Sequence, residues 1–305
     1  MANMTLADLR GDPGRLRKEA VIRATFLAAA TLSIVVSGLI VFSLLREAWT
    51  FVAEVEWKTV WTDGWFPRRG HYDIKTLISG SLLVTAIAMA IAGPIGLGAA
   101  IYLSEYASPR LRRLVKPALE ILAGIPSVVL GFFAISFVSP ELVQRFTDAT
   151  LFNLTAAGIG VGILTIPLVA SVSEDAMRAV PTSLREASYG MGAKKVTTCV
   201  KVVIPAAVSG LVAAFILAIS RAIGETMVVF IAGGAGGGSL FHLDPNQPGT
   251  TMTAAMASQA AGTDQVRGAG LTFQSLFFVG LVLFLITLAL NLIADRFVRR
   301  VRQRY

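Results

Sequence analysis

The sequence predicts an all-α integral membrane protein with six transmembrane helices. The chain of 305 residues is 54% hydrophobic and only 15% charged, with a mean hydropathy of +0.68, whereas an average soluble domain carries about 25% charged residues. It also contains six segments without Asp, Glu, Lys or Arg that are each about 20 residues or longer, which is the length that a helix needs to cross a bilayer.

These six segments give the order of the predicted spans. They are centred near Val35, Met89, Leu130, Gly162, Leu217 and Val282. The first is too long for the apolar part of a cleaved signal peptide, so we expect a retained anchor. We predict a cytoplasmic N-terminal segment at 1–23, a six-helix domain at 24–300 and a basic cytoplasmic tail at 301–305. Within the domain, an external segment spans about 46–75 and a long cytoplasmic loop about 174–207.

The basic residues predict the orientation. Nineteen of the 27 Lys and Arg residues fall in the N-terminal segment, in the loops after spans 2 and 4, and in the tail. Because Lys and Arg are enriched in cytoplasmic loops, we expect both termini in the cytoplasm. This topology also explains the net charge of +8 without nucleic-acid binding, which we do not expect.

Composition disfavours several other functions. Cys199 is the single cysteine, and His71 and His242 are the two histidines, so neither a disulfide framework nor a histidine zinc site is expected. No GxxxxGK[ST] phosphate-binding loop occurs, so the chain is not expected to hydrolyse ATP alone. The sequence shows no metal-ligand cluster and no catalytic set, which predicts a non-enzymatic protein.

Two further patterns concern packing and partners. All four tryptophans fall in the external segment, where they either anchor the chain at the membrane interface or contact an external protein. They are Trp49, Trp57, Trp61 and Trp65. Gly158 and Gly162 form a GxxxG step, which predicts close approach of two helices.

Span 5 contains an arginine and a glutamate. Arg221 and Glu225 are four residues apart, so on a continuous helix both project from one face. Ionisable side chains at membrane depth are costly and usually face a bundle interior or a water-filled path. Two hypotheses follow: the residues form a structural pair that holds helices together, or they form a charged station on a permeation path.

A station of this kind favours an oxyanion. The guanidinium of Arg221 is always protonated, and its planar fork of donors fits an oxyanion through two parallel hydrogen bonds. The carboxylate of Glu225 repels a fully ionised anion but accepts a hydrogen bond from an anion that retains a proton. Phosphate retains at least one proton near neutral pH and sulfate retains none. The two residues are therefore consistent with phosphate rather than sulfate, without identifying the substrate.

The long cytoplasmic loop contains a helix–glycine–helix pattern. Pro181 followed by Thr182 and Ser183 indicates a helix start, and Gly190 and Gly192 permit a sharp turn before a second helix. Such an element has no core of its own. It either docks into another protein or serves as a solvated connection.

This loop resembles the EAA loop of ABC-importer permeases, whose pattern is E-A-A, three residues, G, nine residues, I, one residue and L-P. The matching residues are Glu186, Ala187, Gly192 and Pro205, and the departures are Ser188, Val202 and Ile204. The resemblance implies a coupling helix that fits a cleft in a cytoplasmic ATPase. It also implies the six-helix type I ABC importer permease fold, also called MetI-like.

Three other segments narrow the resemblance to the membrane subunits of phosphate-specific ABC importers. They are LAGIPSVVLGF at 122–132, SRAIGETMVV at 220–229 and TTMTAAMAS at 250–258. The Thr226-Met227 pair is similar to the PstC type rather than the PstA type. By this resemblance, the path of phosphate includes Arg221, Glu225 and Thr226.

The resemblance also implies a location and a set of partners. The location is the bacterial inner membrane. The partners are a second related permease of the PstA type, two cytoplasmic ATPase subunits that bind ATP and Mg, an external phosphate-binding protein and membrane lipid. No cofactor is expected in this chain.

Other functions remain open from the residues alone. The nearest alternative is the same type of permease for another oxyanion, such as sulfate, molybdate or phosphonate. A second is a non-transporting structural or sensory subunit, in which Arg221 and Glu225 only pack helices. A third, an intramembrane enzyme, is disfavoured because no catalytic set is present.

Overall fold

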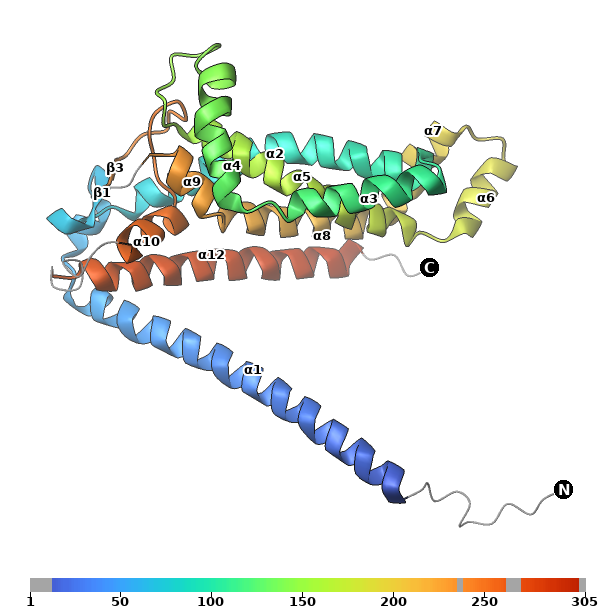
Figure 1. Cartoon of the computed structure of the whole chain (residues 1–305), viewed down its shortest axis with the longest axis horizontal. Helices are drawn as coiled ribbons and strands as arrows, with labels where there is room; N and C mark the ends of the chain where they lie inside the picture. The colour runs from blue at the N-terminus through green and yellow to red at the C-terminus, as the bar shows by residue number, and fades with distance from the viewer. Residues whose placement is uncertain (1–12, 235–237, 262–269, 302–305) are drawn as a thin grey trace.

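The computed structural model describes residues 13–234, 238–261 and 270–301. Residues 1–12 of the predicted N-terminal segment and residues 302–305 of the predicted basic tail lie outside the described residues. Most of the described chain is helical, and the long helices other than the first lie side by side in one bundle (Figure 1).

The described helices account for the six predicted spans. Five are single helices that are long and apolar enough to cross a membrane: Arg17–Glu54, Ile74–Tyr106, Leu154–Arg178, Lys195–Ile223 and Thr272–Arg299. The span predicted around Leu130 is a bent pair, Pro109–Ala123 with Ser127–Val143, whose halves are bent by 84°. The prediction of six spans is confirmed when this pair is counted as one span.

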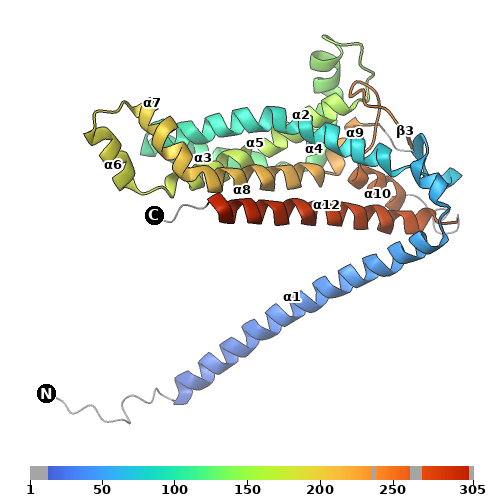
Figure 2. The same cartoon turned by 180° about the vertical axis from the view of Figure 1, so that it is seen from behind.

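Five helices form the bundle, and α1 (Pro13–Glu54) diverges from it (Figures 1 and 2). The bundle helices are α2 (Ile74–Ile101), α3 (Pro109–Ala123), α5 (Leu154–Arg178), α8 (Ile204–Ile223) and α12 (Thr272–Val301). The C-terminal part of α1 packs on α12, where the rings of Phe51 and Phe278 stack with centroids 4.8 Å apart. The rest of α1 is an exposed apolar helix.

The bend in the third span results from residues that interrupt a helix. Gly124 caps the end of α3, and Pro126 precedes α4 (Ser127–Phe133), which continues into the π-helical η4 (Ala134–Val143). Pro126 has no amide N–H to donate, and its backbone, at φ −57° and ψ 132°, is not helical. The residue before a proline is also disfavoured in the helical region, so the chain turns here.

Helix α3 corrects one part of the predicted topology. The basic residues predicted in a loop after span 2 lie instead on α3: Arg110, Arg112, Arg113 and Lys116. The hydroxyl of Ser108 accepts a hydrogen bond from the amide of Leu111 at 3.3 Å, and Pro109 occupies the first turn, so this helix has both an N-cap and a favourable first residue. A search for charge-free segments misses such a helix because its charged residues interrupt the apolar run.

A small antiparallel sheet lies at one end of the bundle and is absent from the all-α prediction. Its order is β2 (His71–Tyr72), β1 (Gly64–Phe66) and β3 (Ser239–Leu240). The 3-10 turns η1 (Trp57–Trp61) and η2 (Pro67–Arg69) flank β1. Strands of two or three residues are too short to show an alternating pattern in the sequence.

The four tryptophans do not share one role. Trp65, on β1, is 2% exposed and packs edge-on against Tyr72. Its predicted role at the membrane interface is therefore wrong, because it forms part of the core that holds the sheet on the bundle. The other three are exposed: Trp49, Trp57 and Trp61.

Helices α2 and α5 pack together through glycines. A Cβ on Gly158 would lie 2.7 Å from the side chain of Ile87, and a Cβ on Gly162 would lie 3.1 Å from the carbonyl of Ala88. The first distance is too short for a Cβ unless Ile87 shifts, and the second is tighter than most Cβ contacts. The close approach predicted from the GxxxG step is therefore confirmed.

Gly158→Ala is expected to destabilise the protein by about 1–3 kcal/mol, because the nearest atom is the Cβ of Ile87, which cannot rotate away. Gly98→Ala in α2 is the matched control, since a Cβ there meets no atom within 4 Å. The measurement is the thermal unfolding midpoint of each variant in detergent. Equal midpoints for the two variants would contradict the packing described here.

Candidate functional site

The helix of span 5 is broken where its charged residues lie. α8 ends at Ile223, and α9 (Met227–Ala232) begins after a break at 224–226. Arg221 is in the last turn of α8, whereas Glu225 is in the break. The prediction that both residues project from one helical face is therefore wrong, because no single helix contains them.

The two charged side chains do not pair with each other. Among the described residues, no hydrogen bond or ion pair joins Arg221 to Glu225. Arg221 is exposed at the C-terminal end of α8, whereas Glu225 is 6% exposed. The Oε1 of Glu225 accepts the amide of Val228 at 3.5 Å, at the start of α9. Each charge therefore lies at the helix end whose dipole favours it.

Helix α10 contacts the backbone of Glu225 through one hydroxyl group. The hydroxyl of Thr253, in α10 (Met252–Ala260), donates a hydrogen bond of 2.8 Å to the backbone carbonyl of Glu225. The amide of Met252 donates to the hydroxyl of Ser81 in α2 at 3.0 Å. The break is thus connected through α10 to α2.

Two further threonines lie in the break and at the start of α10. Thr226 is half-buried in the break, and its hydroxyl donates to the carbonyl of Gly224 at 3.3 Å. Thr251 is the N-cap of α10, and its hydroxyl lies 3.2 Å from that of Thr253. Sequence reasoning named Thr226 and missed Thr253 and Ser81. The TTMTAAMAS segment was the available signal, because its threonines fall at the start of a helix.

The geometry of the break fits a site within a membrane. Irregular backbone at membrane depth is tolerated where it is buried in protein or lines a water-filled cavity. In transporters, broken helices with charged or polar ends commonly form the substrate site. Among the described residues, no group pairs with the guanidinium of Arg221, so its donors are available to an anion. We therefore identify Arg221, Glu225, Thr226 and Thr253 as the candidate translocation site.

The predicted coupling loop forms a second candidate site at the opposite end of the bundle (Figure 1). It consists of α6 (Thr182–Gly190), α7 (Lys195–Thr198) and the π-helical η5 (Cys199–Val203), which leads into α8. α6 contains no buried residue. Glu186 and Ala187 are exposed on it, and Met191 just after it is 88% exposed. The loop therefore presents a surface that this chain does not cover.

Gly192 ends α6 in a Schellman motif. It adopts a left-handed backbone with φ of 80°. Its amide donates to the carbonyl of Tyr189 at 2.9 Å, and the amide of Ala193 donates to the carbonyl of Ser188 at 3.1 Å. This pair of bonds is the one that defines the motif, and glycine is favoured because it adopts positive φ without steric cost.

Pro205 lies at the start of α8, directly after η5. Inside a regular α-helix, a proline ring clashes with the carbonyl four residues earlier, which here belongs to Lys201. The wider π-helical turn at Cys199–Val203 precedes the proline and relieves this contact. The last residue of the EAA-like pattern therefore coincides with a local change in helix geometry.

Residues 92–305 match the protein family described as "Binding-protein-dependent transport system inner membrane component". This chain belongs to that family. The match includes the break in span 5 and the whole coupling loop.

Two relatives of this transport-system component align with nearly the whole chain. It is 30% identical to "Phosphate transport system permease protein PstC" of Pasteurella multocida, over 94% of this chain and 93% of the relative. It is 32% identical to the PstC protein of Mesorhizobium japonicum, over 94% of this chain and 91% of the relative.

Solved structures of ABC importers share the fold. A bacterial alginate ABC transporter in complex with an alginate-pentasaccharide-bound periplasmic protein has a TM-score of 0.66 at 13% identity, over 95% of this chain and 98% of that one. The inward-facing MetNI methionine ABC transporter has a TM-score of 0.56 at 21% identity, over 75% of this chain and 96% of that one. The predicted MetI-like permease fold is therefore confirmed.

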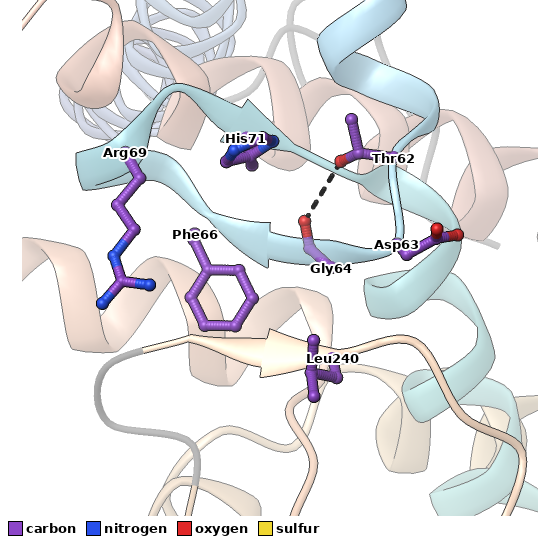
Figure 3. A pocket seen from close by; sticks show the side chains of 7 residues that line it. All are labelled: Thr62, Asp63, Gly64, Phe66, Arg69, His71 and Leu240. Atoms are coloured by element: carbon purple, nitrogen blue, oxygen red, sulfur yellow. Dashed lines mark hydrogen bonds between the residues drawn. The ribbon is translucent and has the colours of Figure 1, made fainter.

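A separate pocket of about 480 Å³ lies at the sheet end of this family member (Figure 3). The guanidinium of Arg69 lies 5.6 Å from the ring centroid of Phe66, a distance typical of a cation–π contact. None of the predicted site residues lines this pocket, so it is not part of the candidate translocation site. Its lining residues are Thr62, Asp63, Gly64, Phe66, Arg69, His71 and Leu240.

Gly192→Ala is expected to cost about 1–2 kcal/mol in the stability of α6, because alanine is strained in the left-handed region. Gly190→Ala is the matched control, since Gly190 is helical and a Cβ there meets no atom within 4 Å. The measurement is hydrogen exchange of the amides of 182–193 in the purified protein. Faster exchange confined to Gly192→Ala is expected, and equal exchange in both variants would contradict the role of the motif.

Proposed function

We propose that this chain is a transmembrane permease subunit of an ATP-driven importer of inorganic phosphate and forms half of the translocation pathway. The observation that carries the proposal is the break in span 5, where Arg221 has no partner among the described residues and the buried carboxylate of Glu225 follows four positions later. The relatives named as phosphate permeases support the choice of substrate, because they match along 94% of this chain.

The chemistry of the break suits phosphate. Arg221 binds two oxygens of the anion through its planar fork of donors. Glu225 accepts a hydrogen bond from the proton that phosphate retains, and it disfavours sulfate, which has no such proton. Thr226 lies in the same break, where it is half-buried, and Thr253 holds the backbone of Glu225 in place.

The proposed orientation has both termini and the coupling loop in the cytoplasm of a bacterium and the small sheet outside its inner membrane. The sheet and the coupling loop lie at opposite ends of the bundle, and α12 ends toward the coupling loop, in agreement with the distribution of Lys and Arg (Figure 1).

The proposed assembly contains three kinds of protein partner besides membrane lipid and phosphate itself. A second related permease of the PstA type completes the pathway, two ATPase subunits bind ATP and Mg, and an external binding protein delivers phosphate. The coupling surface on this chain includes Glu186, Ala187 and Gly192, with Pro205 at the base of α8. Closure of the ATPases on ATP moves α6, the bundle opens to the outside, and hydrolysis restores the inward-open state. This chain contributes no catalytic residue and binds no cofactor.

Arg221→Gln is expected to reduce phosphate uptake by about ten- to hundredfold, because it removes charge-assisted hydrogen bonds to the anion. The measurement is ATP-dependent uptake of labelled phosphate into vesicles that hold the full complex. Arg145→Gln is the matched control, since Arg145 is exposed and its ion pair with Glu141, at 3.8 Å, is a surface contact. Normal uptake by a correctly assembled Arg221→Gln complex would contradict the proposed site.

Glu225→Gln is expected to relax selectivity, because glutamine keeps the acceptor for the amide of Val228 but loses the negative charge. Repulsion between like charges about 4 Å apart costs a few kcal/mol. Sulfate should therefore inhibit phosphate uptake by the variant at a concentration at least about tenfold lower than it needs in the wild type.

Glu141→Gln controls for the loss of one carboxylate at an exposed position. Unchanged resistance to sulfate in Glu225→Gln would exclude the selective role of Glu225. Strong inhibition of the wild type by sulfate or molybdate would instead assign the permease to another oxyanion. Full function after replacing Arg221 and Glu225 together by leucine would favour the structural alternative.

A further inference from the structure

One arginine on the coupling loop binds the ends of two bundle helices. Arg185 lies on α6, and its side chain is only 16% exposed. Its Nη1 donates to the carbonyl of Val180 at 2.7 Å, and its Nη2 donates to the carbonyl of Met177 at 2.8 Å. Met177 lies in the last turn of α5, where backbone carbonyls lack helical partners, and Val180 lies two residues beyond the end of this helix. The guanidinium therefore fastens α6 to α5.

The same guanidinium is paired with a carboxylate from α2. Nη2 of Arg185 lies 2.9 Å from Oε1 of Glu105. Glu105 belongs to the π-helical end of α2, η3 (Tyr102–Tyr106), and its side chain is 4% exposed. The hydroxyl of Ser104 donates to the same carboxylate at 2.9 Å. A buried ion pair with this many hydrogen bonds holds its geometry firmly, since breaking it leaves an uncompensated buried charge.

The two helices held by Arg185 extend from the coupling loop to the candidate translocation site. At its far end, α2 carries Ser81, which binds the start of α10, and α10 in turn binds Glu225 through Thr253. α5 packs on α8 and α9, the two helices on either side of the break. Displacement of Arg185 therefore acts on the helices that position both sides of the break.

We propose that Arg185 and Glu105 are positioning residues that transmit movement of the coupling helix α6 to α2 and α5. This inference rests on the proposed function and names residues outside the EAA-like pattern and outside the break. Leu184, the neighbour of Arg185, packs on the apolar cluster that contains Met177, Val180 and Val203. That apolar contact holds α6 against the bundle, whereas the ion pair sets the orientation of α6 relative to α2 and α5.

A second charged cluster nearby provides the matched control. Glu174, at the end of α5, is fully buried and pairs with Lys116 at 2.9 Å and with Arg112 at 3.2 Å, both on α3. Arg178 lies 3.7 Å from the same carboxylate. This cluster joins α3 to α5 at the same end of the bundle, but none of these residues lies on α6. Arg178→Gln therefore removes a peripheral ion pair without loosening the coupling helix.

The test uses the full complex reconstituted in vesicles. Its readouts are ATP hydrolysis with and without the phosphate-loaded external binding protein, and phosphate imported per ATP hydrolysed. Glu105→Gln removes the ion pair but leaves both bonds of Arg185 to α5. Arg185→Lys keeps the charge but lacks the planar fork that reaches all three acceptors.

Both variants are expected to keep assembly and basal hydrolysis and to lose at least about fivefold in stimulation by the binding protein and in phosphate imported per ATP. Arg178→Gln is expected to match the wild type in both readouts. A purely structural role would lower basal hydrolysis and assembly together and leave the ratio unchanged.

Three outcomes would overturn the proposal. The first is full stimulation of ATP hydrolysis by the binding protein in Glu105→Gln and Arg185→Lys. The second is an equal loss of stimulation in Arg178→Gln, and the third is failure of both Glu105→Gln and Arg185→Lys to assemble. These results differ from failure of the proposed function, in which the wild-type complex itself does not import phosphate.

Discussion

The absence of water in the bilayer interior is the constraint on which this structure depends. Every backbone N–H and C=O at membrane depth must find its partner within the protein, which is why the described membrane spans are helical. The break between α8 and α9 interrupts this helical hydrogen bonding and needs compensation. There the hydroxyl of Thr253 donates to the carbonyl of Glu225, and the carboxylate of Glu225 accepts the amide of Val228. The groups that make the break tolerable are also the groups that make it polar enough to receive an ion.

Charged side chains are paired near the coupling loop, whereas Arg221 at the break has no partner among the described residues. Near the coupling loop, the buried carboxylates of Glu174 and Glu105 are each held by cationic partners within 3.2 Å. At the break, Arg221 has no such partner among the described residues, although a carboxylate lies four positions away. Charges that hold helices in place are paired, whereas a charge that serves a passing anion must keep its donors available. This contrast supports a division of the chain into a coupling end and a translocation site.

Parts of the fold follow directly from local sequence. Charge-free length predicted the spans because the cost of placing a charge in hydrocarbon applies residue by residue. Gly158 and Gly162 predicted close packing, and Gly192 predicted a turn, because only glycine accepts those contacts or that backbone. The 84° bend and the helical state of 110–116 were not predicted. Gly124 and Pro126 interrupt the span, but the angle between its halves depends on how α3 packs against α5. Periodic charge looks the same in a loop and on one face of a helix.

The sequence by itself determined the membrane-spanning architecture, the position of the coupling loop and the identity of the two charged residues in span 5. Only the tertiary structure decided which charges are partners. Arg221 and Glu225 are four residues apart and do not pair, because α8 ends between them. Arg185 and Glu105 are 80 residues apart and do pair, because the ends of α2, α5 and α6 meet at one place. Hydropathy is a local sum along the chain and can be read from the sequence. An ion pair requires two side chains to lie close together in space, which depends on where the helices end and how they pack.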